Sequence, residues 1–399
     1  MKKLLLPLAL VALAVPAATA ANTPGVDAKT IVLGSTAPLS GPETAYEPVV
    51  SGAQAYFAYV NAHGGVYGRK IVYRIEDDGY DPSRTVPATR KLVEQDHVLA
   101  MFNTVGTEQA LSVRDYLNQL QVPQLFVGSG AVTLNDPKRY PWTIPFLPSF
   151  VGEGALYGRQ IAKTRPKARI AVLYEDSEYG KELLAGLKQG LGRRASQVAA
   201  TQTYEVTDVD LTQQIQSLKA SGADTLVLFS LPKQSIQAFV AAAKLGWRPQ
   251  EYVSGVSIDP IVMKIARASA GPQTGEGAIS SAYLFDPTNP ANAKLAGVKL
   301  YLSIMKRYLP REDPKAVAHL YGMAVAYLMV DTLKRAGRNP TRASVLRAAT
   351  HLDVPHNPFM FPDERIRTSP TNFFPVRFAH LVRFHAGFWR FQKPLLRTS

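Results

Sequence analysis

The segment from Thr30 to Ile71 constrains the fold most strongly. A short apolar run, Ile31 to Leu33, leads into a loop of small residues, Gly34 to Pro42, and then into a helical stretch. At the carboxyl end of a parallel strand, Gly and Pro let the backbone approach a bound molecule, and hydroxyl groups and the helix N-terminus offer hydrogen-bond donors. The segment therefore predicts a ligand site at a strand end of an α/β fold, although a loop of this composition also suits a simple turn.

The rest of the chain alternates short β-branched runs with amphipathic stretches, a pattern typical of α/β folds with parallel sheets. It restarts in the middle of the chain, so we expect two similar doubly wound lobes with parallel central sheets. The predicted strands are 31–35, 70–76, 98–103, 123–128, 169–174, 199–204, 224–230 and 251–256, and the predicted helices are 46–62, 82–95, 108–120, 181–191, 210–221, 233–245, 291–308 and 315–336.

Several crossovers should join the lobes. The proline-marked stretch Pro141 to Pro148 predicts the first, and returns are expected near 279–283 and 355–360. Multiple crossing segments form a hinge, so we expect the cleft to open and close. The predicted division is 29–146 plus 283–356 for the first lobe and 147–282 plus 357–399 for the second.

The N-terminal stretch, Met1 to Ala20, has the layout of a secretory signal. Lys2 and Lys3 precede an apolar run from Leu4 to Val15, and small residues end at Ala20, where we expect cleavage. A membrane anchor is the alternative, but the apolar run is shorter than the roughly 20 residues that span a bilayer. The chain has no Cys, which excludes a lipid-attachment cysteine, disulfides and thiolate metal sites. We therefore expect a free, soluble, periplasmic monomer.

Charge argues against a nucleic-acid partner. The formal net charge is +14, but Lys and Arg are spread along the chain and no aromatic residues are interleaved with them as a stacking platform requires. The C-terminal tail is denser in positive charge, which predicts either a solvated face or attraction to an acidic partner or anionic surface. Its basic residues are Arg365, Arg367, Arg377, Arg383, Arg390, Lys393 and Arg397.

Catalytic motifs are missing from the sequence. It contains no Gly-x-Gly-x-x-Gly, Walker, Gly-x-Ser-x-Gly or His-Glu-x-x-His pattern. The histidine pairs His351/His356 and His380/His385 lie five residues apart, a spacing that does not put two rings on one helical face, so no metal site is predicted. Acidic pairs at strand ends more often cap turns than act as general acid and base. The pattern favours binding over catalysis and predicts no cofactor.

An exported hydrolase is a competing hypothesis. Ser129 or Ser257 would be its nucleophile, but neither has a plausible Ser-His-acid spacing in the sequence.

A set of motifs at the strand ends carries a family resemblance, running from about Lys29 to at least Thr350. They are Ala37 to Pro42 (APLSGP), Asn61 to Gly68 (NAHGGVYG), Asp77 to Pro82 (DDGYDP), Asn103 to Thr107 (NTVGT), Ser129 to Ala131 (SGA) and Ile170 to Gly180 (IAVLYEDSEYG). In their order and spacing the chain resembles the leucine/isoleucine/valine-binding family of solute receptors, which serve ABC importers. Val122 to Ala131 and Asn135 to Thr143 are similar to members that take up aromatic and other organic acids.

The resemblance implies the type I periplasmic binding-protein fold and a solute held between the lobes. Family members hold a ligand carboxylate with hydroxyls and backbone amides after two strands, which is physically reasonable because neutral donors at helix starts stabilise an anion. The matching positions are Gly106 and Thr107, then Ser129, Gly130 and Ala131, with Tyr46 and Tyr179 as cleft-lining aromatics and Phe146 closing one side at the crossover.

Two positions depart from the amino-acid receptors of the family. Val132 stands where they carry Thr, and Val256 stands where they carry an acidic residue for the ligand ammonium. An unpaired buried ammonium costs several kcal/mol, so the departures favour an aromatic or aliphatic carboxylate without an amine. In another alignment Asp259, Glu108 or Glu175 could supply the missing charge.

The resemblance also implies ABC permease subunits in the inner membrane as the partner. A branched-chain amino-acid receptor, or a receptor that presents its liganded form to a signalling protein, is the alternative that the sequence leaves open.

Overall fold

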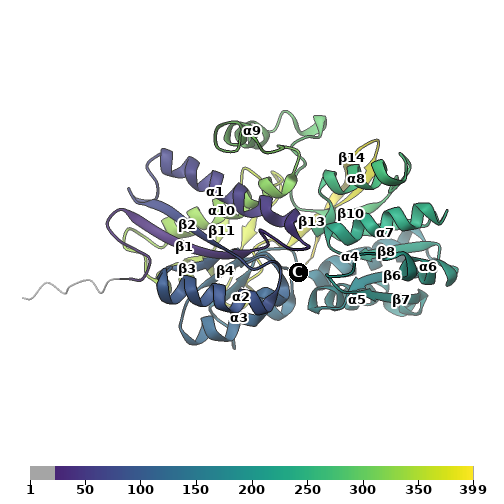
Figure 1. Ribbon diagram of the computed structural model, residues 1–399, viewed down its shortest axis with the longest axis horizontal. Coiled ribbons are helices and arrows are strands. Elements are labelled where there is room, and N and C mark those ends of the chain that lie inside the picture. Colours follow the sequence, from purple (N-terminus) through teal and green to yellow (C-terminus); the bar gives the residue numbers. More distant parts are fainter. Residues whose placement is uncertain (1–22, 399) are drawn as a thin grey trace, which may run out of the picture.

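The structure is a computed structural model in which residues 23–398 are described. Two lobes lie side by side along the long axis of the molecule (Figure 1), and each has a central sheet with helices on its faces. The expected α/β class is confirmed, and both central sheets are parallel except for an antiparallel edge in the second lobe. The predicted signal segment, Met1 to Ala20, lies outside the described residues.

The first lobe has a five-stranded, all-parallel sheet in the order β2-β1-β3-β4-β5. The inner strands are buried on both faces, as β4 shows with four buried residues in a row, whereas the edge strand β2 has one buried residue among eight. Burial on both faces explains why the inner strands are apolar runs and do not alternate strictly. Its elements are β1 (Thr30–Ala37), α1 (Glu47–Ala62), β2 (Lys70–Asp77), α2 (Pro82–Arg90), β3 (Ala100–Phe102), α3 (Thr107–Gln119), β4 (Gln124–Val127) and β5 (Thr143–Pro145).

The second lobe has a seven-stranded sheet in the order β14-β13-β10-β9-β8-β6-β7. Five strands run parallel, and β13 and β14 add an antiparallel edge. Its elements are α4 (Phe150–Thr164), β6 (Ile170–Glu175), α5 (Glu178–Leu191), β7 (Val198–Tyr204), α6 (Thr212–Ala220), β8 (Thr225–Phe229), α7 (Pro232–Lys244), β9 (Gln250–Val253), α8 (Pro260–Ala270), β10 (Ile279–Ala282), β13 (Phe378–His385) and β14 (Phe388–Arg397).

Between β10 and β13 the chain returns to the first lobe. It forms α9 (Ala296–Tyr308), α10 (Val317–Arg335), α11 (Arg342–Ala349) and the short pair β11 (Asp353–Val354) and β12 (Ile366–Arg367). Helix α10 packs on α1 at two glycines, because a Cβ at Gly52 would collide with the carbonyl of His319 and a Cβ at Gly322 with that of Val49. This close packing brings the first turn of α10 to the cleft between the lobes.

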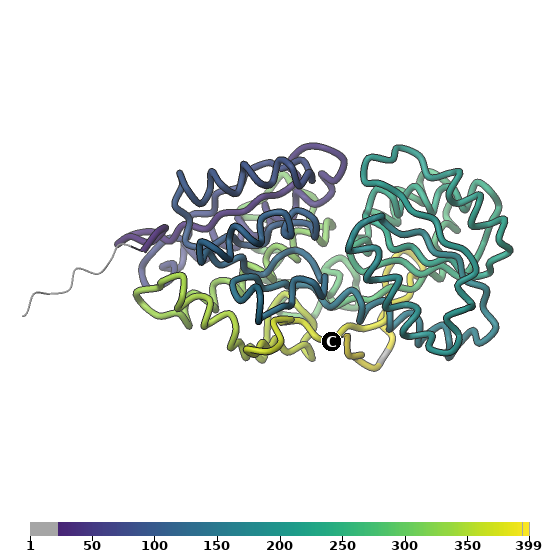
Figure 2. The backbone as a smooth tube through the Cα atoms, turned by 90° about the horizontal axis from the view of Figure 1, so that it is seen from below, coloured from purple at the N-terminus to yellow at the C-terminus, as the bar shows by residue number. Residues whose placement is uncertain are grey.

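The chain therefore passes between the two sheets three times: after β5, after β10 and before β13. Figure 2 shows these crossing segments between the lobes, with the C-terminus beside them. The first crossing follows β5, within and just after the predicted stretch Pro141 to Pro148. The last crossing lies later in the chain than the expected 355–360. The backbone N–H of Phe373 still donates to Asn135 Oδ1 of the first lobe (2.7 Å). The residue bounds proposed for the lobes stay a prediction.

The sequence pattern missed several elements. Helix α2 ends at Arg90 and continues as a π-turn, Lys91–Gln95, after a Pro inside the helix. Helices α4, α8 and α11 and the hairpin of β13 and β14 were not predicted. The basic C-terminal tail is largely part of this hairpin, where Arg383 donates to the carbonyl of Gly277 (3.1 Å). Among residues 23–398, no helix is both long and apolar enough to cross a membrane.

Candidate functional site

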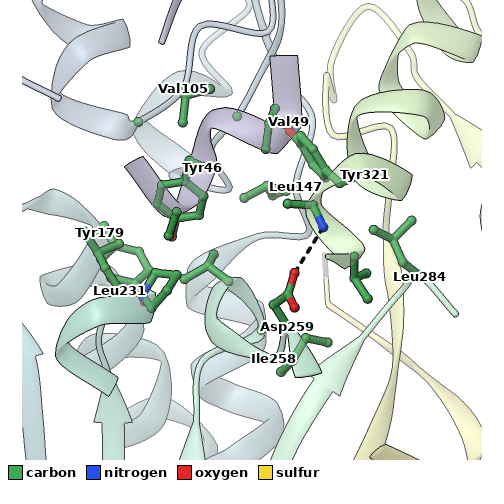
Figure 3. Close-up of a pocket in the computed structure, with 18 of the residues that line it drawn as sticks. Tyr46, Val49, Val105, Leu147, Tyr179, Leu231, Ile258, Asp259, Leu284 and Tyr321 are labelled. Atoms are coloured by element: carbon green, nitrogen blue, oxygen red, sulfur yellow. Dashed lines mark hydrogen bonds between the residues drawn. The ribbon is translucent and has the colours of Figure 1, made fainter. Parts of the chain in front are cut away.

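A cavity of about 150 Å³ lies between the lobes, where the carboxyl ends of the strands of both sheets meet. Residues of the first lobe, its returning helix α10 and the second lobe all contribute to the wall, as Figure 3 shows. Most of the wall is aliphatic, including Val49, Val105, Leu147, Leu231, Ile258 and Leu284. A space with such a lining favours a largely apolar molecule.

Five tyrosines add aromatic surface to the wall. Tyr46 and Tyr80 come from the first lobe and their rings stack with centroids 6.2 Å apart. Tyr179 lies at the start of α5, Tyr283 follows β10, and Tyr321 lies on α10. The sequence analysis named only Tyr46 and Tyr179. Tyr80 lies in the strand-end motif Asp77 to Pro82 but was not singled out, and no local pattern places Tyr283 and Tyr321 at the cleft.

The two predicted tyrosines lie close together across the cleft in Figure 3. Tyr179 is held in place by its hydroxyl, which donates to the carbonyl of Ser230 (3.3 Å), and by an edge-on contact with the ring of Phe150 (4.9 Å). Burial raises the pKa of both hydroxyls well above their ordinary value, so both stay neutral at physiological pH. The neutral hydroxyl of Tyr46 can therefore donate a hydrogen bond to a bound molecule, whereas that of Tyr179 already donates to Ser230.

The predicted anion-binding residues divide into two groups. Gly106 and Thr107 line the cavity at the start of α3, whose N-cap residue, Gly106, makes no side-chain cap. Ser129, Gly130 and Ala131 do not line it. Ser129 Oγ is fully buried 2.8 Å behind Thr107 Oγ1 and accepts from the N–H of Ala131 (3.1 Å). Ser129 thus orients the threonine hydroxyl.

The carbonyl of Gly130 accepts from the N–H of Phe150 (2.8 Å), so this glycine joins the predicted anion site to the first turn of α4. A Cβ at Gly130 would also collide with the carbonyl of Pro148. The residue therefore allows the chain to cross close behind the cavity wall.

Phe146 lies behind the cavity wall. It is fully buried and packs edge-on against Tyr321 (5.5 Å between centroids) and Tyr283 (6.3 Å). Its part is to support two tyrosines that line the cavity. Val256, which follows β9, does line the cavity, so the residue at the predicted ammonium position is apolar.

Two acidic residues line the cavity. Asp259 caps α8, where Oδ1 accepts from the N–H of Ile261 (3.0 Å) and Oδ2 accepts from the N–H of Ala318 on α10 (3.2 Å). Burial raises the pKa of Asp259 to about 6. Glu153 of α4 accepts from the N–H of Gly255 (2.7 Å), and burial raises its pKa too. The sequence analysis named Asp259 as an alternative charge and missed Glu153.

Glu108 and Glu175, the other two alternatives, do not line the cavity. Glu175 Oε2 accepts from the hydroxyl of Tyr204 (3.1 Å), and burial raises its pKa to about 7. Glu108 accepts from the N–H of Glu178 across the cleft (2.9 Å). No Lys, Arg or His is among the residues that line this cavity.

Neither of the two serines considered as a hydrolase nucleophile lines the cavity. Ser257 is buried and its hydroxyl donates to the carbonyl of Ser230 (2.6 Å), while Ser129 lies behind Thr107. In the part of the chain that the structure describes, no three His, Cys, Asp or Glu side chains cluster as a metal site would require.

Comparisons with known proteins agree with this geometry. The family model for periplasmic binding proteins matches residues 30–383. The Leu/Ile/Val-binding protein homolog 7 of Brucella suis is 25% identical over 361 residues, which cover 86% of each chain.

Two solved structures show the same fold. A branched chain amino acid ABC transporter protein from Thermus thermophilus with bound valine superposes with a TM-score of 0.80 at 16% identity, covering 92% of this chain and 96% of that one. A solute binding protein of an ABC transporter from R. palustris, in complex with 4-hydroxybenzoate, superposes with a TM-score of 0.77 at 16% identity, covering 92% and 97%.

Proposed function

The chain belongs to the periplasmic binding protein family, and from this premise we propose that it traps a small organic solute between its lobes and delivers it to the permease of an ABC importer. The observation that carries the proposal is the cavity, because Thr107 and Tyr321 of the first lobe and Tyr179 and Val256 of the second share its wall. A solute that contacts both lobes favours the closed state by the difference between its affinities for the closed and open forms. In this proposal the protein is a carrier and not an enzyme.

We propose that the solute is an aromatic or aliphatic carboxylate without an amine. Thr107 and the start of α3 offer neutral donors on the cavity wall, and the remaining wall is apolar and aromatic. A cavity of about 150 Å³ is large enough for a benzene ring. Support comes also from the R. palustris neighbour, whose bound ligand, 4-hydroxybenzoate, has this chemistry.

A branched-chain amino acid is the second candidate, and Asp259 favours it. Its carboxyl group lines the cavity in the second lobe, where an ammonium group could contact it. Against this candidate, both oxygens of Asp259 already accept backbone N–H groups.

The proposal places the protein in the periplasm as a soluble monomer, after cleavage of the signal segment behind Ala20. Its partners would be the solute and the permease subunits of the inner membrane, and it would need no cofactor.

Thermal-shift screening tests the proposal and separates the two candidates. Matched pairs differ by the amine alone: 4-hydroxyphenylpropionate against tyrosine, and 4-methylpentanoate against leucine. A solute at 100 times its Kd stabilises the folded state by about 2.7 kcal/mol, which raises Tm by several degrees in domains of this size. We expect the amine-free acids to raise Tm. A shift with the amino acids alone selects the second candidate, and no shift with any small organic solute contradicts both.

A further inference from the structure

Carboxyl groups from both lobes gather around the cleft without basic partners. Within residues 23–398 none of them forms an ion pair, whereas partly exposed acids such as Asp77 and Asp353 pair with arginines. The first lobe contributes Glu43 and Glu108, and the second contributes Glu175, Glu182 and Asp259.

Glu43 is the most isolated of these groups. It lies in the loop before α1, it is fully buried, and neither of its carboxyl oxygens has a hydrogen-bond partner. The second lobe lies against it, with Gln234 of α7 and Glu175 of β6 as its polar neighbours. Nε2 of Gln234 donates to the carbonyl of Val206 (3.1 Å), and Oε1 of Gln234 has no hydrogen-bond partner either.

Three of the other carboxyl groups bridge the cleft. Glu182 of α5 accepts from the N–H groups of Val132 (2.7 Å) and Thr133 (3.2 Å) in the first lobe. Asp259 accepts from Ala318, and Glu108 accepts from Glu178, each across the cleft. These contacts exist only when the lobes meet, so opening the cleft returns the carboxyl groups to water.

We propose that closing the cleft takes up protons from solution onto the carboxyl groups that it buries, with Glu43 as the principal acceptor. The inference rests on the two-lobed closure of the proposed function but not on the identity of the solute. The proton binds a carboxyl oxygen of Glu43, and the neutral acid then lies between the lobes. No covalent bond to the solute is involved.

The physical reason is the cost of burying a negative charge without a positive partner. Burial raises the pKa of Glu43 to about 8, although the neighbouring amide of Gln234 and, to a smaller extent, the charge of Lys233 oppose this. Burial also raises the pKa of Glu175 and Glu182 to about 7 and that of Asp259 to about 6, although backbone N–H groups partly offset it for the last two.

Apart from Lys233 near Glu43 and Lys181 near Glu108, the titratable groups that face these carboxyls add no positive charge. Around Glu43 they are Tyr46, Tyr80, Tyr179 and Tyr204, around Glu175 they are Glu108 and Glu205, around Glu182 it is Glu178, and around Asp259 they are Asp286 and Tyr301.

Proton uptake fixes the direction of the pH effect. A group whose pKa is higher in the closed state than in the open state favours closing at low pH. The closed fraction then falls as the pH rises from the open-state pKa to the closed-state pKa. For Glu43 this range runs from its ordinary pKa of 4.5 to about 8. Glu43 alone would then change the closed-to-open ratio by about tenfold per pH unit within that range.

The chain offers a direct measurement because it has no Cys. Cysteines introduced at two exposed positions, Leu120→Cys in the first lobe and Val209→Cys in the second, take a donor and an acceptor dye. Single-molecule energy transfer on the solute-free protein then gives the closed fraction from pH 5 to pH 9. We expect the short-distance population to fall steadily as pH rises.

Two variants locate the effect. Glu43→Gln keeps the size of the side chain and removes its titration, so we expect a flattened pH response, most clearly between pH 7 and 8. Glu94→Gln removes the same charge from an exposed position of the first lobe, in the π-turn after α2, and should keep the wild-type response. Thermal melts at pH 6 confirm that each variant is folded.

Three results would overturn the proposal: a wild-type distance distribution that does not change with pH, closing that increases as pH rises, or a Glu43→Gln variant with the full wild-type response. Closing that increases as pH rises would indicate that the acidic cleft binds a cationic solute. Because no solute is added, failure of the solute screen leaves this test intact, and failure here leaves the transport proposal standing.

Discussion

Thr107→Val tests the anion site most sharply. Valine has nearly the shape of threonine, so the change removes one hydroxyl and little else. That hydroxyl lies 2.8 Å from Ser129 Oγ, on a residue that is 6% exposed at the cavity wall. Ser129 keeps the N–H of Ala131 as a partner, so we expect the free energy of unfolding to fall by only about 1 kcal/mol.

The effect on binding should be larger. A hydrogen bond to a charged group contributes about 1.5–3 kcal/mol, and 1.4 kcal/mol corresponds to a tenfold change in affinity. We therefore expect Thr107→Val to weaken the binding of a carboxylate by roughly 10-fold to 150-fold. Isothermal titration calorimetry with the best acid from the solute screen measures this.

Two controls define what would refute the reasoning. The methyl ester of the same acid should lose much less affinity, because it offers no charged acceptor. Ser112→Ala removes an exposed hydroxyl from the same helix and should leave the affinity unchanged. If Thr107→Val binds the acid as tightly as the wild type does, or loses as much affinity for the ester, the carboxylate does not lie at the start of α3.

Three further predictions concern stability. Gly52→Ala should lower the free energy of unfolding by several kcal/mol, measured by urea titration, because the new Cβ meets the carbonyl of His319 and overpacking is costly; an unchanged midpoint would contradict the packing of α1 on α10. Phe146→Ala should cost about 3–5 kcal/mol in the same assay and weaken solute binding through the tyrosines it supports; stability loss without any change in affinity would remove it from the site. Glu364 is buried without a hydrogen-bond partner and burial raises its pKa to about 9, so wild-type stability should fall as pH rises from 4.5 to 9 and Glu364→Gln should fall less; parallel curves for the two proteins would show that Glu364 does not titrate in this range.

The fold was largely predictable from the sequence because local patterns set it. Buried parallel strands give runs such as Ile170 to Tyr174, and turn residues such as Asp81-Pro82 mark a helix start, where the Asp81 side chain does accept from the N–H of Ser83 (2.8 Å). Helix α4 was not predicted, because its N-cap residue, Ser149, follows a run of prolines and aromatics that is typical of a linker.

The site was predictable only in part. Five of the predicted residues line one cavity, and each lies in a segment that follows a strand: Tyr46, Gly106, Thr107, Tyr179 and Val256. Four other predicted residues lie behind the cavity wall: Ser129, Gly130, Ala131 and Phe146. Nothing in a linear sequence pattern distinguishes a residue of the wall from the residue that supports it. The sequence also gave no way to place Tyr283 and Tyr321, because their position depends on where the chain crosses between the lobes.

The acidic surroundings of the cavity are the part that sequence reasoning could least foresee. Glu43 and Glu175 are 132 positions apart and become neighbours only through contact between the lobes. Asp259 faces Ala318 for the same reason. Such pairs are set by tertiary structure, and local propensity carries no information about them.

A crystal structure of the protein with the acid that most raises its Tm tests the proposed function most directly. We predict density for the acid between the lobes, in contact with Thr107 and Tyr46 on one side and with Tyr179 and Val256 on the other. Density for the acid anywhere else, with this cavity filled by solvent alone, would contradict the proposal that the two lobes trap the solute between them.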